Sequence, residues 1–321
     1  MLRRLAFLFV ATLLAAVPAV AQEVHLAVIV GLAGEPEHRE LFQRWASTLV
    51  DTASGRLGVP RERIVYLAEQ PDQDAKRATG KSTKQEIEAA FGRLAKLANE
   101  DDVVFVVLIG HGTFDGKVAK FNVPGPDLTP ADFAPLLKSL RSKHVVFVNT
   151  ASASGDFVKP LIGSDRTIVT ATKSASERNE TAFARHFVDA FAKGGADADK
   201  DQRVSVLEAF EYARREVQRF YEKERRLLTE HAVLEDGREG ALARRVFLGS
   251  ADGETPSADA GDPTLLALRQ ERRDLERRLD ALKARKETTA AELYEEELAK
   301  LLLELALKDE EIRRRPADKR P

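Results

Sequence analysis

The sequence predicts an α/β fold with a mostly parallel β-sheet, followed by a helical C-terminal segment. Five short runs rich in Val, Ile and Leu have the length of buried strands, and stretches with helical periodicity separate them. After residue 263 the composition changes, and Leu, Glu, Arg and Lys dominate. Hydrophobic residues make up 43% of the 321 positions, which provides enough apolar material for a sizeable core.

The five runs are continuous rather than alternating, as in parallel strands that helices cover on both faces. Their alternation with helical patterns predicts a doubly wound domain, in which ligands bind at the carboxyl ends of the strands. The predicted strands are HLAVIVGL (25–32), RIVYLAE (63–69), VVFVVLIG (103–110), HVVFVN (144–149) and RTIVTAT (166–172). The predicted helices cover about 36–56, 84–98, 130–141, 178–193 and 204–228.

Residues 1–21 have the pattern of a bacterial secretory signal. Arg3 and Arg4 precede an apolar run of 13 residues, and Ala-Val-Ala ends the segment before Gln22. The run is too short for an ordinary membrane span, and no later apolar run reaches that length. A buried first helix is the alternative. We therefore expect a periplasmic or secreted protein with no membrane span once the signal is removed.

The rest of the chain divides into an α/β domain (22–248), a small, acidic, proline-containing linker (249–263) and a helical segment (264–315). Lys and Arg number 50 against 52 Asp and Glu, so no global basic field favours nucleic acid as a partner. The chain has no cysteine. This excludes disulfides, thiolate metal sites and a cysteine nucleophile.

The segment 264–315 has the spacing of a coiled coil, with two apolar seams. Between the seams, Thr289 and Glu292 form a capping-box pattern that predicts the start of a second helix. We expect helices over about 264–286 and 290–314, paired antiparallel or docked on a partner helix or a second copy of the chain. A single long helix is the alternative. The seams run through Leu268, Leu275 and Leu282, and through Tyr294, Leu298, Leu301, Leu305 and Ile312.

Two loops at the expected carboxyl edge of the sheet carry groups suited to catalysis. His111 lies between two glycines directly after the third strand, and imidazole is the usual side chain for proton transfer near neutral pH. Ser152 lies in a loop of small residues after the fourth strand. A serine near a histidine is a candidate nucleophile–base pair. Tight turns built from small residues are the alternative explanation for both loops.

These two loops resemble those of the caspase–legumain superfamily of cysteine peptidases. The legumain-type loop reads Ala-Cys-Glu-Ser-Gly, and residues 151–155 read Ala-Ser-Ala-Ser-Gly, so that Ser152 falls on the cysteine. His111 precedes Ser152 by 41 residues, near the spacing of roughly 50 seen in caspases. The stretches 170–174 and 177–179 also resemble the strand and loop after the nucleophile. The resemblance covers about 24–230 and implies a caspase-like three-layer fold and a peptide or protein ligand.

The resemblance implies roles for individual residues. His111 and Ser152 take the catalytic positions, and Arg39 and Ser174 take substrate-binding positions. For Arg39, a solvent-facing arginine in the first turn of a helix is the alternative. An alcohol is far less acidic than a thiol and needs a well-oriented base, so we expect a pseudopeptidase or peptide-binding module. One rival is an active hydrolase in which Ser152 attacks, His111 is the base and amides near Ala153 and Gly112 form an oxyanion hole. A second rival is a scaffold that works through its helical hairpin.

Residues 197–208 have the spacing of an EF-hand-like calcium loop. Asp197, Asp199 and Asp201 occupy positions 1, 3 and 5, Arg203 offers a carbonyl at position 7, and Glu208 is at position 12. Oxygen ligands at these offsets converge on one hard cation. Position 6 departs from the pattern, since it is Gln202 where glycine is usual. The alternative is an acidic helix start.

Overall fold

The computed structural model describes residues 22–249 and 290–314, together with scattered positions between 264 and 285. The predicted signal segment 1–21 and most of the predicted linker lie outside the described residues. The chain forms two compact units, Met1–Gly253 and Glu254–Pro321. None of the helices in the described ranges combines the length and the apolar character needed to cross a bilayer.

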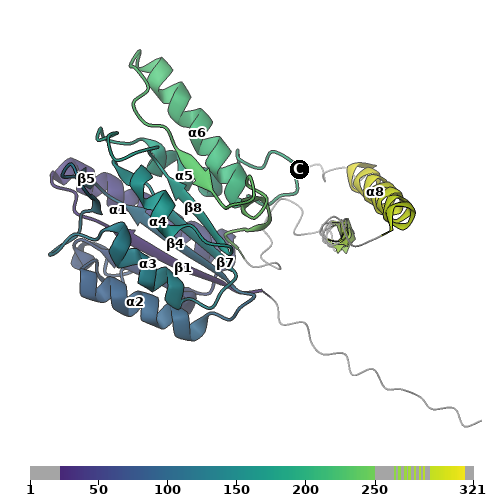
Figure 1. Ribbon diagram of the computed structural model, residues 1–321, viewed down its shortest axis with the longest axis horizontal. Helices are drawn as coiled ribbons and strands as arrows, with labels where there is room; N and C mark the ends of the chain where they lie inside the picture. The colour runs from purple at the N-terminus through teal and green to yellow at the C-terminus, as the bar shows by residue number, and fades with distance from the viewer. Residues whose placement is uncertain are drawn as a thin grey trace, which may run out of the picture. The chain divides into compact units, whose positions relative to one another are not determined.

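The first unit is built on a seven-stranded sheet with the order β3-β2-β1-β4-β7-β8-β9 (Figure 1). All neighbouring strands are parallel except β8 and β9. This arrangement confirms the predicted mostly parallel α/β fold. The strands are β1 (Val24–Val30), β2 (Ile64–Ala68), β3 (Gly80–Lys81), β4 (Val103–Ile109), β7 (His144–Asn149), β8 (Arg166–Thr170) and β9 (Val233–Glu235).

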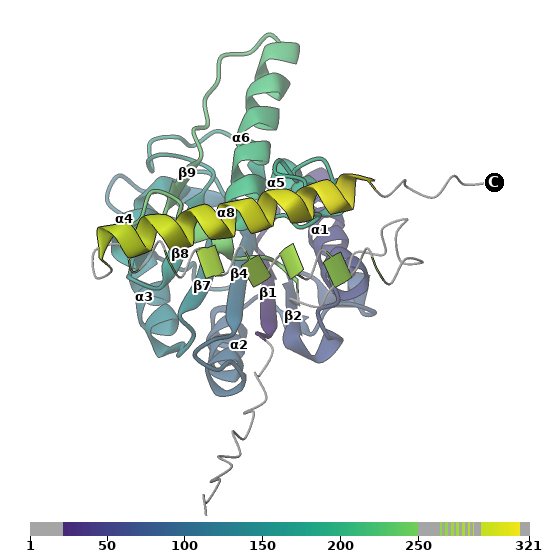
Figure 2. The same cartoon turned by 90° about the vertical axis from the view of Figure 1, so that its right-hand side faces the viewer.

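Helices cover both faces of the sheet, which makes three layers (Figures 1 and 2). Every residue of β1, β2 and β4 is buried, which explains why these strands are continuously apolar in sequence. One apolar cluster joins the sheet to α1 (Pro36–Asp51), α5 (Phe183–Lys193) and α6 (Val206–Lys223). A second cluster joins its other face to α2 (Lys84–Leu97), α3 (Pro130–Ser139) and α4 (Val158–Leu161).

The structure differs from the predicted bounds of three helices, two at the start and one at the end. α5 begins at Phe183 rather than near 178, because the preceding residues form polar turns at the sheet edge. α6 begins at Val206 because Ser205 and Glu208 form a capping box. α1 ends at Asp51, and a π-helical turn (Thr52–Arg56) follows it. The antiparallel hairpin β5 (Gly112–Phe114) and β6 (Ala119–Phe121), and strand β9, are too short to show a sequence period.

The second unit contains α8 (Ala291–Arg314). Its predicted seam packs against the seam of the preceding segment, with Leu301 against Leu275, Leu279 and Leu282. Ion pairs join Arg272 to Asp309 and Lys308 to Glu271. Residue numbers therefore increase along one segment in the direction in which they decrease along the other. The described residues therefore pack antiparallel. The predicted hairpin stays a prediction, because residues 286–289, which would form its turn, lie outside the described residues.

Candidate active site

The sheet topology brings the loops with the predicted site residues to one edge. β1 pairs with β4, β4 with β7 and β7 with β8, all in parallel. The loops that follow β4, β7 and β8 carry His111, Ser152 and Ser174, respectively, and Arg39 lies in the first turns of α1, the helix that follows β1. Because the carboxyl ends of parallel strands meet at one edge, all four residues come from the same rim of the sheet.

His111 is held by a backbone carbonyl and two rings. Its Nε2 lies 3.1 Å from the carbonyl oxygen of Ala33. A carbonyl only accepts hydrogen bonds, so this contact requires the proton on Nε2 and leaves Nδ1 with a free lone pair. The rings of His38 and Phe42 contact the imidazole edge-on, with centroids 4.9 and 5.0 Å away. Burial, together with the nearby His38, lowers the pKa of His111 and favours the neutral base.

Ser152 is bound to the backbone of the His111 loop. Its Oγ donates to the carbonyl oxygen of Gly112 at 2.9 Å, and the Gly112 amide lies 3.4 Å from the same Oγ. A Cβ on Gly112 would lie 2.2 Å from the Ser152 carbonyl oxygen, so only glycine permits this approach. Ala153 follows in the left-handed region with φ of 55°, which turns the chain sharply after Ser152.

His111 and Ser152 line the same small enclosed cavity, together with Trp45, Glu180 and Thr181. Its volume is about 10 Å³, which is close to the space of one water molecule. The structure therefore brings the predicted pair together. Among the described residues, neither side chain hydrogen-bonds to the other, because Ser152 donates to Gly112 and His111 binds Ala33.

The two predicted substrate-binding residues have other polar partners at this rim. The Nε of Arg39 donates to a carboxylate oxygen of Glu69 at 3.2 Å. The Oγ of Ser174 lies 2.7 Å from the Oγ of Ser176. Neither Arg39 nor Ser174 lines the cavity of His111 and Ser152. Their role in substrate binding stays a prediction.

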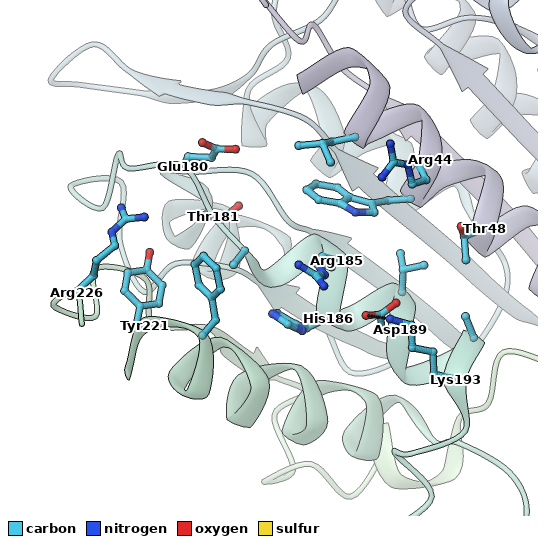
Figure 3. Close-up of a pocket in the computed structure, with 16 residues that line it drawn as sticks. Arg44, Thr48, Glu180, Thr181, Arg185, His186, Asp189, Lys193, Tyr221 and Arg226 are labelled. Atoms are coloured by element: carbon cyan, nitrogen blue, oxygen red, sulfur yellow. Dashed lines mark hydrogen bonds and ion pairs between the residues drawn. The ribbon is translucent and has the colours of Figure 1, made fainter. Parts of the chain in front are cut away.

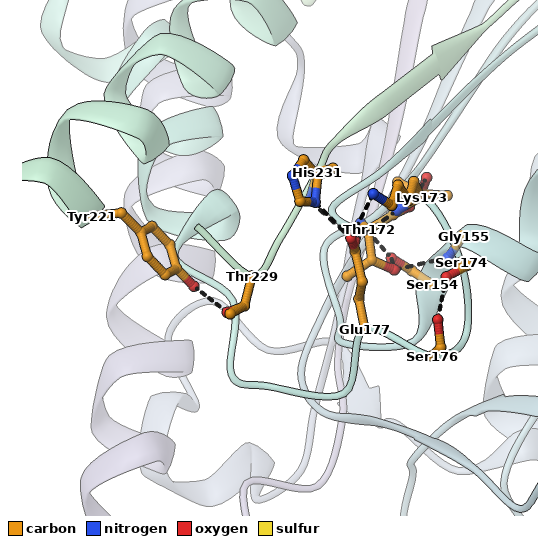
Figure 4. A network of polar contacts seen from close by, with 11 residues as sticks. Ser154, Gly155, Thr172, Lys173, Ser174, Ser176, Glu177, Tyr221, Thr229 and His231 are labelled. Atoms are coloured by element: carbon orange, nitrogen blue, oxygen red, sulfur yellow. Dashed lines mark hydrogen bonds and ion pairs between the residues drawn. The ribbon is translucent and has the colours of Figure 1, made fainter. Parts of the chain in front are cut away.

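The predicted oxyanion donor at Ala153 needs a correction. The Ala153 amide donates to the carbonyl oxygen of Glu177 at 2.7 Å, so it is not free to stabilise a developing oxyanion. The carboxylate of the same residue, Glu177, accepts two hydrogen bonds from His231 (Figure 4). The Nδ1 of His231 lies 2.6 Å from one carboxylate oxygen, and the backbone amide of His231 lies 3.1 Å from the other. Glu177 thus joins the Ser152 loop, through its backbone carbonyl, to the segment before β9, through its carboxylate.

Two further groups at this rim were missed by sequence reasoning. His38 on α1 pairs with Glu180 through Nε2 at 3.0 Å, directly beside the ring of His111. Ser154 and Gly155 bind the side chain of Thr172 at 3.2 and 3.0 Å, which fixes the nucleophile-type loop to the end of β8 (Figure 4). Single Glu, His and Thr residues that are far apart in sequence give no pattern from which these contacts are predictable.

Glu230 is a buried carboxyl group next to this rim, and it predicts a pH dependence of stability. Both its oxygens accept the amide of Ala182, at 3.0 and 2.9 Å. Burial raises its pKa from about 4.5 to about 8, and the nearby Glu177 and Glu180 add to this. The folded state therefore binds the proton more tightly than the unfolded chain. The free energy of unfolding should fall as pH rises through this window, by up to about 1.4 kcal/mol per pH unit.

Urea unfolding at several values between pH 5 and 8 checks this expectation, with Glu230→Gln as the control, because glutamine cannot lose the proton. The wild-type protein should lose more stability across the window than E230Q. Parallel pH profiles for the two proteins would show that Glu230 titrates normally.

The acidic loop before α6 brings together three of its predicted ligands. Carboxylate oxygens of Asp197, Asp199 and Glu208 lie within 4.8 Å of one another, while Asp201 is outside this group. Burial raises the pKa of Asp197, and raises that of Asp201 to about 7. Gln202, at the position where glycine is usual, has φ of 70°.

Backbone contacts of the same loop also suit the alternative of a capped helix. Glu208 accepts from the amide of Ser205 at 2.9 Å, as in a capping box, and from the amide of Ala198 at 2.9 Å. The guanidinium of Arg203 stacks over the ring of Phe247 at 3.7 Å. The geometry is therefore compatible with both predicted uses of this loop.

A three-layer α/β unit with a histidine and a small-residue nucleophile-type loop at adjacent strand ends defines a caspase-like peptidase fold. Residues 78–229 match the family model described as Peptidase C13 family. The matched region belongs to this legumain/caspase-like family, which confirms the predicted relationship. No match was found among curated proteins.

Proposed function

We propose that the protein is an exported, legumain-like pseudopeptidase that binds peptide segments. One observation carries the proposal: the Ser152 hydroxyl donates to the Gly112 carbonyl rather than to the imidazole of His111. A serine nucleophile needs its base within hydrogen-bond reach and a third group that orients the base. Here the orienting group is the neutral carbonyl of Ala33, and the shared cavity holds about one water. Export rests on the signal pattern of residues 1–21.

A larger cavity beside the His111–Ser152 pair offers space for a ligand. It has a volume of about 570 Å³, lies between α1, α5 and α6, and shares Trp45, Glu180 and Thr181 with the small cavity (Figure 3). Apolar side chains line it beside Glu180, Asp189, Arg44 and Arg185, and neither arginine has a hydrogen bond or ion pair among the described residues. This lining suits a peptide segment that carries an apolar and an acidic side chain.

A fluorophosphonate probe tests the first half of the proposal. We expect wild-type protein to show no labelling above the background of Ser152→Ala, because the hydroxyl donates to the Gly112 carbonyl rather than to His111 and an alcohol ionises far less readily than a thiol. Mass spectrometry of the intact protein measures the covalent adduct. Labelling at Ser152 that disappears in both S152A and His111→Ala would instead establish the rival, an active serine-dependent hydrolase.

Peptide binding tests the second half. Fluorescence anisotropy with labelled peptides that contain an acidic and an aromatic residue should give saturable binding. The variant Trp45→Ala should weaken binding at least about 10-fold, which corresponds to about 1.4 kcal/mol, since a bound peptide would cover the partly buried indole ring. Leu227→Ala is the matched control, because Leu227 is 88% exposed and does not line the cavity. Equal loss in both variants, or no binding by the wild type, would contradict the proposal.

The scaffold alternative is favoured by a separate observation on α8. Leu302, Leu303 and Leu307 are all about half exposed or more, outside the seam that packs on the preceding segment. An apolar helix face of this kind pairs with another helix or a second copy. Deletion of 249–321 separates the two functions. Partner capture that is lost on deletion, with peptide binding unchanged, assigns the capture to the helical segment.

We also propose that the loop 197–208 binds calcium, supported by the convergence of Asp197, Asp199 and Glu208. Calorimetric titration should show one site that is lost in Asp197→Ala. Because burial raises the pKa of Asp197, one of the converging carboxylates, calcium affinity should fall as the pH drops and this group takes up a proton. A titration without heat at neutral pH, and a melting temperature unaffected by calcium, would favour the helix-cap alternative.

A further inference from the structure

Three potential metal ligands meet at the edge of the sheet opposite the candidate active site. β1 and β4 are parallel, with Val24 opposite Val103, so Glu23 lies beside Asp102. Because strand residues alternate between faces, Glu23 and His25 project to the same face of the sheet. The register therefore places Glu23, His25 and Asp102 together, and their ligand atoms lie within 4.8 Å of one another.

His25 is the unusual member of this cluster, since it is buried without a hydrogen bond. It is only 2% exposed, and neither of its ring nitrogens has a hydrogen-bond partner among the described residues. Its Nε2 lies 3.5 Å from Oδ2 of Asp102, which is too long for a normal hydrogen bond.

The separation of 3.5 Å matches the spacing of two ligands on one metal. A tetrahedral Zn²⁺ site with bonds near 2.0–2.1 Å places neighbouring ligand atoms about 3.4 Å apart. We propose that Glu23, His25 and Asp102 form a binding site for a divalent transition metal of the Zn²⁺ class. One imidazole and two carboxylates form a ligand set that suits Zn²⁺ better than Ca²⁺ or Mg²⁺, which take oxygen ligands only.

The groups around the cluster orient two of the ligands. The amide of Glu23 donates to Oδ1 of Asp102 at 3.1 Å, and the amide of Asn99 donates to Oδ2 at 2.7 Å. These bonds fix the Asp102 carboxylate, as outer partners do in metal sites. Arg63 pairs with Glu23 and offsets one of the two negative charges. A cavity of about 550 Å³ borders the cluster on the side of His25, and Arg61, Arg63 and Arg93 also line it.

Metal titration of the untagged chain in the presence of excess Ca²⁺ tests the proposal, since Ca²⁺ keeps the acidic loop 197–208 from competing. We expect Zn²⁺ to bind with one equivalent per chain, and Co²⁺ to give the intense visible absorption of a tetrahedral site. His25→Ala should weaken Zn²⁺ binding at least about 100-fold, and Glu23→Gln at least about 10-fold. Asp199→Asn is the matched control in the acidic loop and should leave binding unchanged.

Two outcomes would overturn the proposal. The first is the absence of a tetrahedral Co²⁺ spectrum in the wild-type protein, which does not depend on any variant folding. The second is Zn²⁺ binding that survives in E23Q and H25A but disappears in D199N, which would place the metal in the acidic loop. If H25A fails to fold, the wild-type spectrum and E23Q decide the question.

Discussion

Replacement of Ser152 by cysteine is expected to create a reactive thiol in a chain that has no other cysteine. The Nδ1 of His111 carries a free lone pair, because Nε2 is bound to the carbonyl of Ala33. A thiol has an ordinary pKa near 8.5 and ionises readily beside such a base, whereas an alcohol does not. Alkylation by iodoacetamide near pH 7 should therefore be at least about 10-fold faster in S152C than in the double variant S152C/H111A.

Ser154→Cys is the matched control for this experiment. Ser154 lies two residues away in the same loop, but it is 0% exposed and bound to Thr172, while Ser152 is 6% exposed. Its thiol should react more slowly than that of S152C. Equal alkylation rates for S152C with and without His111 would show that the imidazole no longer acts as a base at this position. Peptide hydrolysis by S152C but not by the wild-type protein would show that serine at position 152 is the reason for the lack of activity.

The largest effect on stability is expected for Asp236→Ala. The Asp236 carboxylate is buried just after β9 and accepts four backbone amides, those of Arg238, Gly240, Leu242 and Ala243, at 2.8–3.1 Å. Alanine leaves these donors without their acceptor. The free energy of unfolding should fall by about 3–5 kcal/mol, measured by urea titration at pH 7.

Asp115→Ala is the control for this substitution, because Asp115 also accepts two backbone amides but lies in an exposed turn. Its effect should be much smaller, because water replaces the lost acceptor in an exposed turn. The backbone amides lower the pKa of Asp236, so its contribution is present above the ordinary pKa and is lost as pH falls through the folded value. D236A should therefore lose part of the acid sensitivity of the wild type. Similar losses in D236A and D115A would contradict the assigned role.

The sheet was predictable from sequence because burial on both faces leaves an uninterrupted apolar run. β4 and β7 match their predicted runs within one residue. β9 was not predictable, because its three half-buried residues are too few to show a hydrophobic period. It is an edge strand and pairs with β8 alone. α5 begins at Phe183, later in the sequence than predicted, because the hydrogen bonds of the preceding polar turns compete with those of a helix.

The location of the candidate site was predictable, because glycines and the ends of apolar runs indicate where loops follow the strands. His111 and Ser152 do line one cavity, as their positions after adjacent strands predict. The direction of their hydrogen bonds was not predictable, since the acceptors are backbone carbonyls of Ala33 and Gly112, which are not visible in a sequence. The same holds for the His38–Glu180 pair, which depends on how α1 packs against the loop before α5.

Trp45 gives the protein an intrinsic optical reporter at its candidate site. It is the single tryptophan of the chain, and it lines both the small cavity of His111 and Ser152 and the larger cavity between α1, α5 and α6. Indole emission shifts with the polarity of its surroundings, so a ligand that enters the larger cavity changes a signal that comes from Trp45 alone when excitation avoids the tyrosine absorption band. Stopped-flow fluorescence of the unlabelled protein therefore reads occupancy of this region in real time.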